Sequence, residues 1–204
     1  MPLNLDNMNS MYIDVLKEIS NIGAGNAATS LSNMVMKKVD MEVPKIDVLE
    51  IEKLVEALGY EENIVVGIYI SFMGDINGTI LTVLDKSSAD NLMKIFFGQK
   101  SEGELYNEME QSALQEIGNI LSGAYINSIS SMTNMTINIS VPSVTVDMVG
   151  SILSVPAVEY GQMSDKIIFI ENKLDVDDDR IIGDFLLMPD VDSFEILFKR
   201  LGVL

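Results

Sequence analysis

The chain contains one sequence pattern twice, and this duplication constrains its fold more than any other feature. Residues 14–34 align without gaps with residues 112–132 at an offset of 98. In first-half numbering, the residues that recur unchanged are Leu16, Glu18, Ile19, Asn21, Ile22, Gly25, Ser30, Ser32 and Met34. A repeat this short cannot cover its own hydrophobic face, so the two copies should share one core. We therefore expect a single domain over 1–204, made of structural repeats at about 10–98 and 106–202.

The same order of elements is predicted for both repeats. A long amphipathic helix comes first, at about 10–36 and 106–131, followed by an apolar, β-branched strand at about 38–49 and 135–147. The later elements are predicted as strands at about 63–72, 78–85, 166–173 and 181–188, and closing helices at about 87–97 and 191–201. Between them, 50–59 predicts a short helix and 148–161 gives no clear pattern. The expected fold class is α+β, with a mostly antiparallel central sheet, a pseudo-twofold axis and two long helices.

A proline lies in the first strand of each repeat. Val43-Pro44 recurs as Val141-Pro142, again at an offset of 98. Proline has no N–H to donate to a sheet ladder, so it is confined to edges and bulges. We expect an edge or a bulge at both positions.

Composition excludes most kinds of catalytic site. The chain has no His and no Cys, which excludes imidazole acid–base catalysis, thiolate nucleophiles and the usual zinc and iron–sulfur ligands. Its formal net charge of −18 disfavours binding to nucleic acid or to anionic membranes. The first ten residues lack the basic and apolar regions of a secretory signal, and no apolar run is long enough to span a membrane. We expect a cytoplasmic protein with no metal site of its own.

The recurring polar residues share one face of the first long helix. At about 100° per residue, the side opposite the apolar stripe carries Asp14, Glu18, Asn21, Gly25, Thr29 and Ser32. The apolar stripe consists of Ile13, Leu16, Ile19, Gly23, Ala27, Leu31 and Met34. A lone Glu and Asn would indicate only a solvated face, and an exposed glycine costs about 0.5–1 kcal/mol relative to Ala. The recurrence of Glu, Asn and Gly at Glu116, Asn119 and Gly123 instead predicts a surface that is used twice.

This spacing resembles the signature of the CheC/CheX/FliY phosphatases of bacterial and archaeal chemotaxis. The signature is Asp or Ser, three residues, Glu, two residues, Asn, twenty-two residues and Pro. Two sets fit every spacing: Asp14, Glu18, Asn21 and Pro44, and Ser112, Glu116, Asn119 and Pro142. Two sites, with no room for the additional segments of FliY-type members, resemble the CheC branch and disfavour a flagellar switch component.

The resemblance implies that the chain dephosphorylates CheY, a response regulator that carries an aspartyl phosphate. It assigns Asn21 and Asn119 to positioning the attacking water, and Glu18 and Glu116 to pairing with the regulator's active-site Lys. The regulator supplies the acyl phosphate and the Mg²⁺, so the chain needs no cofactor of its own.

Four other residues of the repeated polar face receive weaker assignments. Gly25 and Gly123 would leave clearance for the docked regulator. Asp14 and Ser112 either adjust the neighbouring Glu or only lie on the docking face, and the sequence does not choose between them. The sequence also does not show which of the two sites is more active.

A second function stays open, in which the chain is a non-catalytic module that binds and regulates the receptor deamidase CheD. The region around Asp147 is the candidate for that contact. We also expect a monomer, because the duplication already supplies the twofold that a single-site homologue would obtain by dimerising.

Overall fold

The computed structural model describes residues 10–59, 61–101, 103, 105–160 and 166–203. The helices are α1 (Ser10–Val35), α2 (Ile51–Ala57), α3 (Lys86–Phe97), α4 (Glu108–Thr133), α5 (Val149–Tyr160) and α6 (Val191–Arg200). The strands are β1 (Val39–Glu50), β2 (Ile64–Gly74), β3 (Gly78–Asp85), β4 (Ile137–Ile139), β5 (Ser143–Met148), β6 (Lys166–Val176) and β7 (Asp179–Pro189). Residues 1–9, in which no secretory signal was expected, lie outside the described part of the chain.

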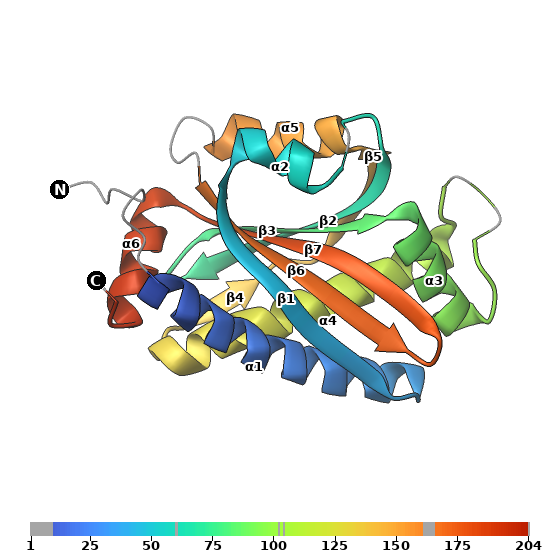
Figure 1. Cartoon of the computed structure of the whole chain (residues 1–204), viewed down its shortest axis with the longest axis horizontal. Coiled ribbons are helices and arrows are strands. Elements are labelled where there is room, and N and C mark those ends of the chain that lie inside the picture. The colour runs from blue at the N-terminus through green and yellow to red at the C-terminus, as the bar shows by residue number, and fades with distance from the viewer. Residues whose placement is uncertain (1–9, 60, 102, 104, 161–165, 204) are drawn as a thin grey trace.

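The strands form one antiparallel sheet in the order β1-β6-β7-β3-β2, and both β4 and β5 pair with β2 at the far edge (Figure 1). This arrangement confirms the predicted α+β class with its antiparallel sheet. In the described part of the chain, no helix is both long and apolar enough to cross a membrane.

Each repeat places its first strand at the edge of the other repeat. β1 pairs with β6, and β5 pairs with β2, while β3 and β7 meet at the centre of the sheet. Residues 77–85 and 182–190 align between the repeats, and their equivalent residues Leu81 and Leu186 pair directly with each other. Both leucines are fully buried. The pseudo-twofold axis therefore passes between Leu81 and Leu186, and the two repeats share one sheet.

Two buried serines connect the repeats in a symmetric way. The Ser88 hydroxyl oxygen accepts the backbone N–H of Ile182 at 3.0 Å, and the Ser193 hydroxyl oxygen accepts that of Asn77 at 2.7 Å. The donors and acceptors occupy equivalent positions in the two repeats. Each bond satisfies a buried hydroxyl. The bonds hold the start of α3 against β7 and the start of α6 against the turn that precedes β3.

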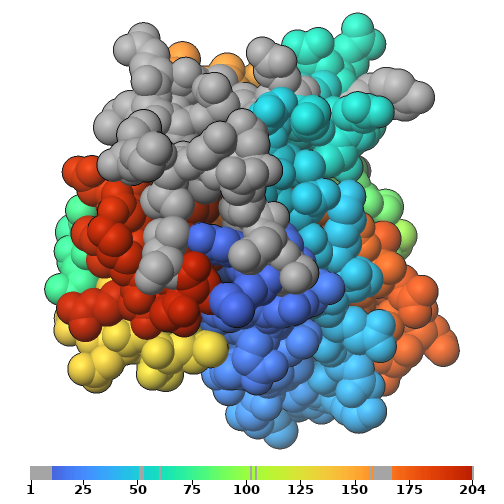
Figure 2. All heavy atoms as spheres, turned by 60° about the vertical axis from the view of Figure 1, so that its left-hand side comes forward, coloured from blue at the N-terminus to red at the C-terminus, as the bar shows by residue number. Residues whose placement is uncertain are grey.

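Helices cover both faces of the sheet. α1 and α4 lie side by side on one face, and α2 and α5 lie on the other (Figure 1). At the N-terminal end of α1, Figure 2 shows its first turns between β1 and α6, where the rings of Tyr12 and Phe198 are 5.2 Å apart. Segment 148–161, which gave no clear pattern, contains the whole of α5, the counterpart of α2.

Both proline predictions are confirmed, but the second one breaks a strand that was expected to be continuous. β1 is an edge strand, and its register shifts between Glu42 and Lys45, on either side of Pro44. The strand expected at 135–147 is wrong as a single element, because it divides into β4 and β5 around Pro142. The missing N–H of Pro142 interrupts the ladder, and this interruption opens the sheet edge beside α4.

Candidate functional site

Four predicted site residues lie exposed on the long helices, Glu18 and Asn21 on α1 and Glu116 and Asn119 on α4. Each Glu precedes its Asn by three residues, so the two side chains are neighbours on one helix face. Within the described residues, no hydrogen bond or ion pair engages these four side chains. They are therefore free to contact a partner.

The opposite face of α1 fixes this orientation. Leu16, Ile19 and Leu31 are buried as predicted, and Ile13 and Met34 at the ends of the stripe are half-buried. Burial of each of these three aliphatic side chains contributes about 1.5–3 kcal/mol to stability. This contribution outweighs any preference of an exposed residue for a different orientation of the helix.

Ser32 and Gly23, which lie on different sides of α1, have separate structural roles. Ser32, expected on the exposed face, is half-buried, and its hydroxyl oxygen accepts the Val39 N–H at 2.9 Å, where the chain turns into β1. Gly23 is buried on the side facing α4, and a Cβ there would lie 3.0 Å from the Tyr125 ring. Ser32 therefore fixes the helix end, and Gly23 allows the two long helices to approach.

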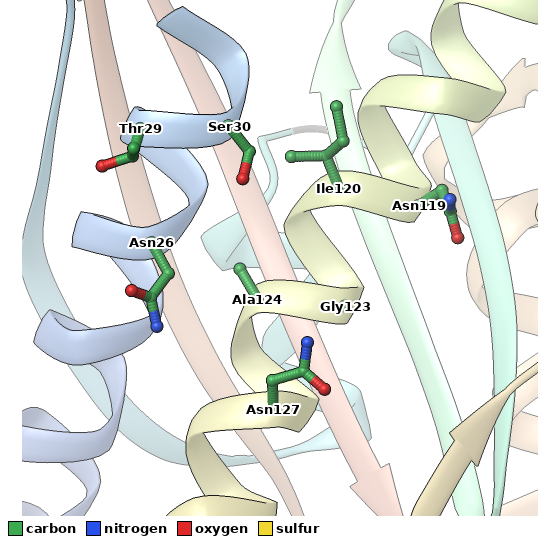
Figure 3. A pocket seen from close by; sticks show the side chains of 8 residues that line it. All are labelled: Asn26, Thr29, Ser30, Asn119, Ile120, Gly123, Ala124 and Asn127. Atoms are coloured by element: carbon green, nitrogen blue, oxygen red, sulfur yellow. The ribbon is translucent and has the colours of Figure 1, made fainter. Parts of the chain in front are cut away.

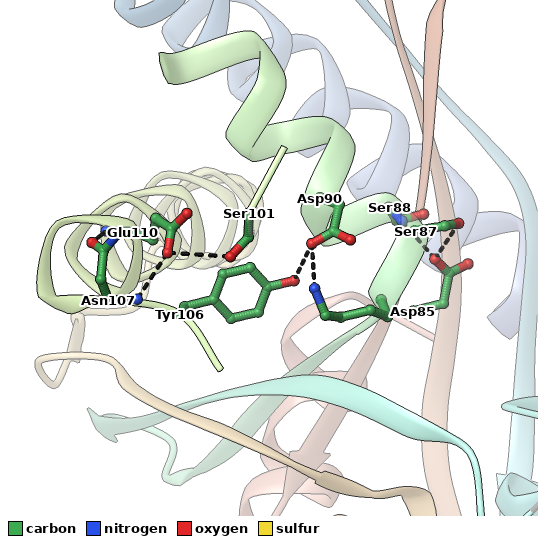
Figure 4. A network of polar contacts seen from close by, with 9 residues as sticks. Asp85, Ser87, Ser88, Asp90, Ser101, Tyr106, Asn107 and Glu110 are labelled. Atoms are coloured by element: carbon green, nitrogen blue, oxygen red, sulfur yellow. Dashed lines mark hydrogen bonds and ion pairs between the residues drawn. The ribbon is translucent and has the colours of Figure 1, made fainter. Parts of the chain in front are cut away.

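The start of α4 is fixed by polar contacts, and Figure 4 shows those of Glu110 with the Asn107 N–H and of Tyr106 with Asp90. The Asn107 side chain accepts the N–H groups of Met109 and Glu110, and the Glu110 carboxylate accepts the Asn107 N–H at 2.8 Å. The Tyr106 hydroxyl donates to Asp90 of α3 at 3.0 Å, and burial raises the pKa of Tyr106. This capping box begins α4 at Glu108, two residues later than predicted, and anchors it to α3.

The second site opens into a hollow of about 360 Å³ between α4 and the break in the edge strand. Its lining residues are Ser112, Gln115, Glu116, Asn119, Ile139, Ser140, Val141 and Pro142. The break is pinned to β2, because Ser140 donates its N–H to the Ser71 carbonyl at 2.8 Å and its Oγ accepts the Ser71 N–H at 3.0 Å. The structure therefore brings together all four members of the second signature, including the distant Pro142.

The other predicted site residues of α1 and α4 lie on the same surface as the Glu–Asn pairs. The Ser112 hydroxyl donates to the Glu108 carbonyl at 2.8 Å and makes no bond to Glu116. Asp14 is exposed at the equivalent position of α1. A Cβ on Gly25 would meet nothing within 4 Å, and one on Gly123 would meet only Ile139 at 3.8 Å. The space above both glycines is therefore open.

A groove of about 470 Å³ runs between α1 and α4 (Figure 3). It is lined by Asn26, Thr29, Ser30, Asn119, Ile120, Gly123, Ala124 and Asn127. Figure 3 shows the Asn119 side chain pointing away from α1, while Asn26 points toward α4. Asn119 also lines the hollow of the second site. Asn119 thus lines both depressions and joins them into one surface.

Asp147 does not belong to this surface. It is half-buried on β5, and its carboxylate accepts the N–H of Met148 at 2.7 Å. Among the described residues, no three acidic, His or Cys side chains gather into a metal site.

Gln115, which lines the hollow of the second site, was not predicted from the sequence. Gln115 falls at the border between the apolar stripe and the polar face of α4, so the helical pattern gave it no clear assignment. Its half-buried side chain becomes significant only because the strand break lies beside it.

The chain is similar to one group of proteins in its family model, its sequence and its fold. Residues 11–47 and 109–146, one segment in each repeat, match the model of the CheC-like family. The CheY-P phosphatase CheC of Bacillus subtilis (strain 168) is 31% identical over 197 residues, which cover 93% of each chain. The crystal structure of Thermotoga maritima FliY is similar, with a TM-score of 0.74 and 20% identity, over 99% of this chain and 98% of FliY. One chain of the crystal structure of a CheX–CheY–BeF₃–Mg²⁺ complex from Borrelia burgdorferi matches with a TM-score of 0.50 and 18% identity, over 81% of this chain and 95% of that chain.

Proposed function

The chain belongs to the CheC-like family, and we propose that it hydrolyses the aspartyl phosphate of phosphorylated CheY at two sites. The observation that carries this proposal is the pair of exposed, unbonded Glu–Asn sets on α1 and α4. The similarity to a CheY-P phosphatase over 93% of the chain supports it. We also expect the chain to act in the cytoplasm, together with its regulator.

The proposed reaction is attack of water on the regulator's phosphorus atom. The water oxygen forms the new P–O bond, the bond between phosphorus and the aspartyl oxygen breaks, and the aspartate leaves as a carboxylate with inorganic phosphate. Catalysis of this type depends mainly on position and electrostatics. The amides of Asn21 and Asn119 suit it, because the amide oxygen accepts from the water while the NH₂ group still donates. An amide also carries no charge that would repel the phosphoryl oxygens.

The two glutamates dock the regulator in this proposal. Glu18 and Glu116 lie one turn before the asparagines and on the same helix face. A carboxylate there can form a charge-assisted hydrogen bond with the regulator's active-site Lys. That contact would hold the phosphoryl group opposite the asparagine. The Mg²⁺ that neutralises phosphoryl charge belongs to the regulator, and the phosphatase chain supplies no cofactor.

A second partner surface, for the deamidase CheD, is proposed at the end of β5, where the strand leads into α5. Asp147 lies there beside Ile64 and Met148, a cross-strand pair in which the residues are 48% and 45% exposed. This apolar pair is separate from both Glu–Asn sets, so one molecule could bind both partners. Met148→Ser should weaken CheD binding, measured by calorimetry, and leave phosphate release unchanged. Equal CheD affinity in the variant would remove this surface from the proposal.

Turnover distinguishes a phosphatase from a binding module. The experiment measures phosphate release from Mg²⁺-loaded, phosphorylated CheY with the chain at about one hundredth of the regulator concentration. The proposal predicts many phosphate ions released per phosphatase molecule. A chain that binds the regulator without accelerating release would be a binding module only.

A further inference from the structure

We propose that Lys17 at the first site and Gln115 at the second are additional catalytic residues, which donate a hydrogen bond to the regulator's phosphoryl oxygens. This inference rests on the proposed function. It adds a third position to each Glu–Asn set and makes the two sites chemically different. The two residues occupy equivalent positions, at the same offset of 98.

The geometry of the second site assigns this role to Gln115. Its side chain lines the hollow together with Glu116 and Asn119. It precedes Asn119 by four residues, so it lies one helical turn away on the same side. Around the helix, Gln115 and Glu116 flank Asn119 on opposite sides, at about 40° and 60° from it.

The Gln115 amide also has no other partner. No hydrogen bond engages its side chain within the described residues. Gln111, one turn earlier, differs in this respect, because its amide donates to the Tyr106 carbonyl at 2.8 Å. A half-buried amide that faces a hollow with free donors is available to an incoming acceptor.

Lys17 takes the equivalent place at the first site. It is exposed on α1, and no carboxylate of the described residues forms an ion pair with it. Many other lysines of this acidic chain hold a carboxylate within 4 Å, namely Lys37, Lys38, Lys53, Lys86, Lys94, Lys173 and Lys199. A free ammonium group one turn from Asn21 can therefore reach an anion that the regulator brings.

Phosphoryl transfer gives both residues a function. Charge is spread over the three equatorial oxygens of the phosphoryl group in the transition state, and preorganised donors stabilise it. If Glu holds the regulator's Lys on one side of Asn, the residue on the other side is placed to donate to a phosphoryl oxygen. Lys17 supplies a full positive charge and Gln115 a neutral dipole, so the first site should depend more strongly on salt than the second.

The test uses full-length variants in which one site is silenced. Asn119→Ala leaves the first site, and Asn21→Ala leaves the second. In the first background, Lys17→Met should lower kcat/KM for phosphorylated CheY at least about tenfold, as expected for a lost hydrogen bond to a charged group. It should also flatten the salt dependence of kcat/KM, and Lys17→Gln should recover much of the lost rate. In the second background, Gln115→Met should cause a similar loss, with no change in salt dependence.

Two controls separate a direct contact from an altered net charge or fold. Lys53→Met removes one positive charge from α2, on the opposite face of the sheet, and should leave every rate unchanged. Titration with the beryllofluoride–Mg²⁺ form of CheY measures regulator affinity without turnover, so it divides each effect between binding and kcat.

The outcomes are distinct for this inference and for the proposed function. If the single-site variants turn over and Lys17→Met and Gln115→Met match their backgrounds, the inference is wrong while the phosphatase function stands. If only one site turns over, the substitution at that site decides the question. If the unmodified chain releases no phosphate, the proposed function and this inference both fail.

Discussion

At the residue scale, the proposed mechanism depends on the difference between an amide and a carboxylate. Asn119→Asp keeps the shape of the side chain but removes the NH₂ donor and adds a negative charge near the phosphoryl oxygens. In the Asn21→Ala background we expect phosphate release to fall about 100-fold, as for a misplaced nucleophile. Initial rates with phosphorylated CheY measure the effect. An active Asp variant would show that the residue acts as a base and not by positioning a neutral donor and acceptor.

A different residue, Asp184, determines a pH dependence of stability. Burial on β7, with smaller contributions from Glu171 and Asp85, raises the pKa of Asp184 to about 7, and Lys45 opposes the shift. Because the folded-state pKa lies above the ordinary value of 3.8, this group stabilises the fold most at low pH, and the stabilisation is lost as pH rises to about 7.

Asp184→Asn removes this titration. The melting temperature of the variant relative to the unmodified chain should rise between pH 4 and pH 7 and then stay constant. Thermal unfolding followed by circular dichroism across this range provides the measurement. A difference that does not vary with pH would mean that Asp184 ionises normally in the folded protein.

At the element scale, the two long helices show which features of the fold follow from sequence. Their apolar stripes predicted both helices to within two residues, and the aligned polar face predicted that the Glu and Asn of each proposed site would be exposed. α5 could not be predicted, because its residues are apolar on nearly all sides and Pro156 lies within it. The hollow of the second site was also missed, since it depends on how Pro142 divides the edge strand beside Gln115. Such a feature arises from tertiary contact, which local periodicity does not record.

Two glycines of α1 give opposite expectations for helix packing. Gly25→Ala meets nothing within 4 Å and should stabilise the helix by about 0.5–1 kcal/mol. Gly23→Ala places a methyl group 3.0 Å from the Tyr125 ring and should destabilise the fold by about 1–3 kcal/mol. Urea unfolding measures both changes.

Gly25→Ala also tests whether Gly25 leaves clearance for the docked regulator. If the regulator docks closely over that residue, Gly25→Ala should raise KM for phosphorylated CheY at the first site, in the Asn119→Ala background, despite the gain in stability. An unchanged KM would remove Gly25 from the docking surface.

At the scale of the whole molecule, the repeats are interleaved and the sheet edges are protected. Each repeat contributes a strand to the edge of the other, so neither repeat has a complete sheet alone. Pro44 and its adjacent bulge interrupt one edge, and Pro142 interrupts the other. Proline and irregular edges hinder pairing with a second sheet. We therefore expect a monomer, and sedimentation equilibrium should give a mass near 22.5 kDa. A concentration-independent dimer would contradict this expectation.

The most direct test of the phosphatase account is the Asn21→Ala, Asn119→Ala double variant. Both substitutions lie on exposed helix faces, so the fold should persist, as circular dichroism can verify. The account predicts that this variant binds the beryllofluoride–Mg²⁺ form of CheY through Glu18 and Glu116 but no longer accelerates phosphate release, while at least one single variant remains active. Undiminished release by the double variant would contradict the account, because the water would then be positioned by other residues.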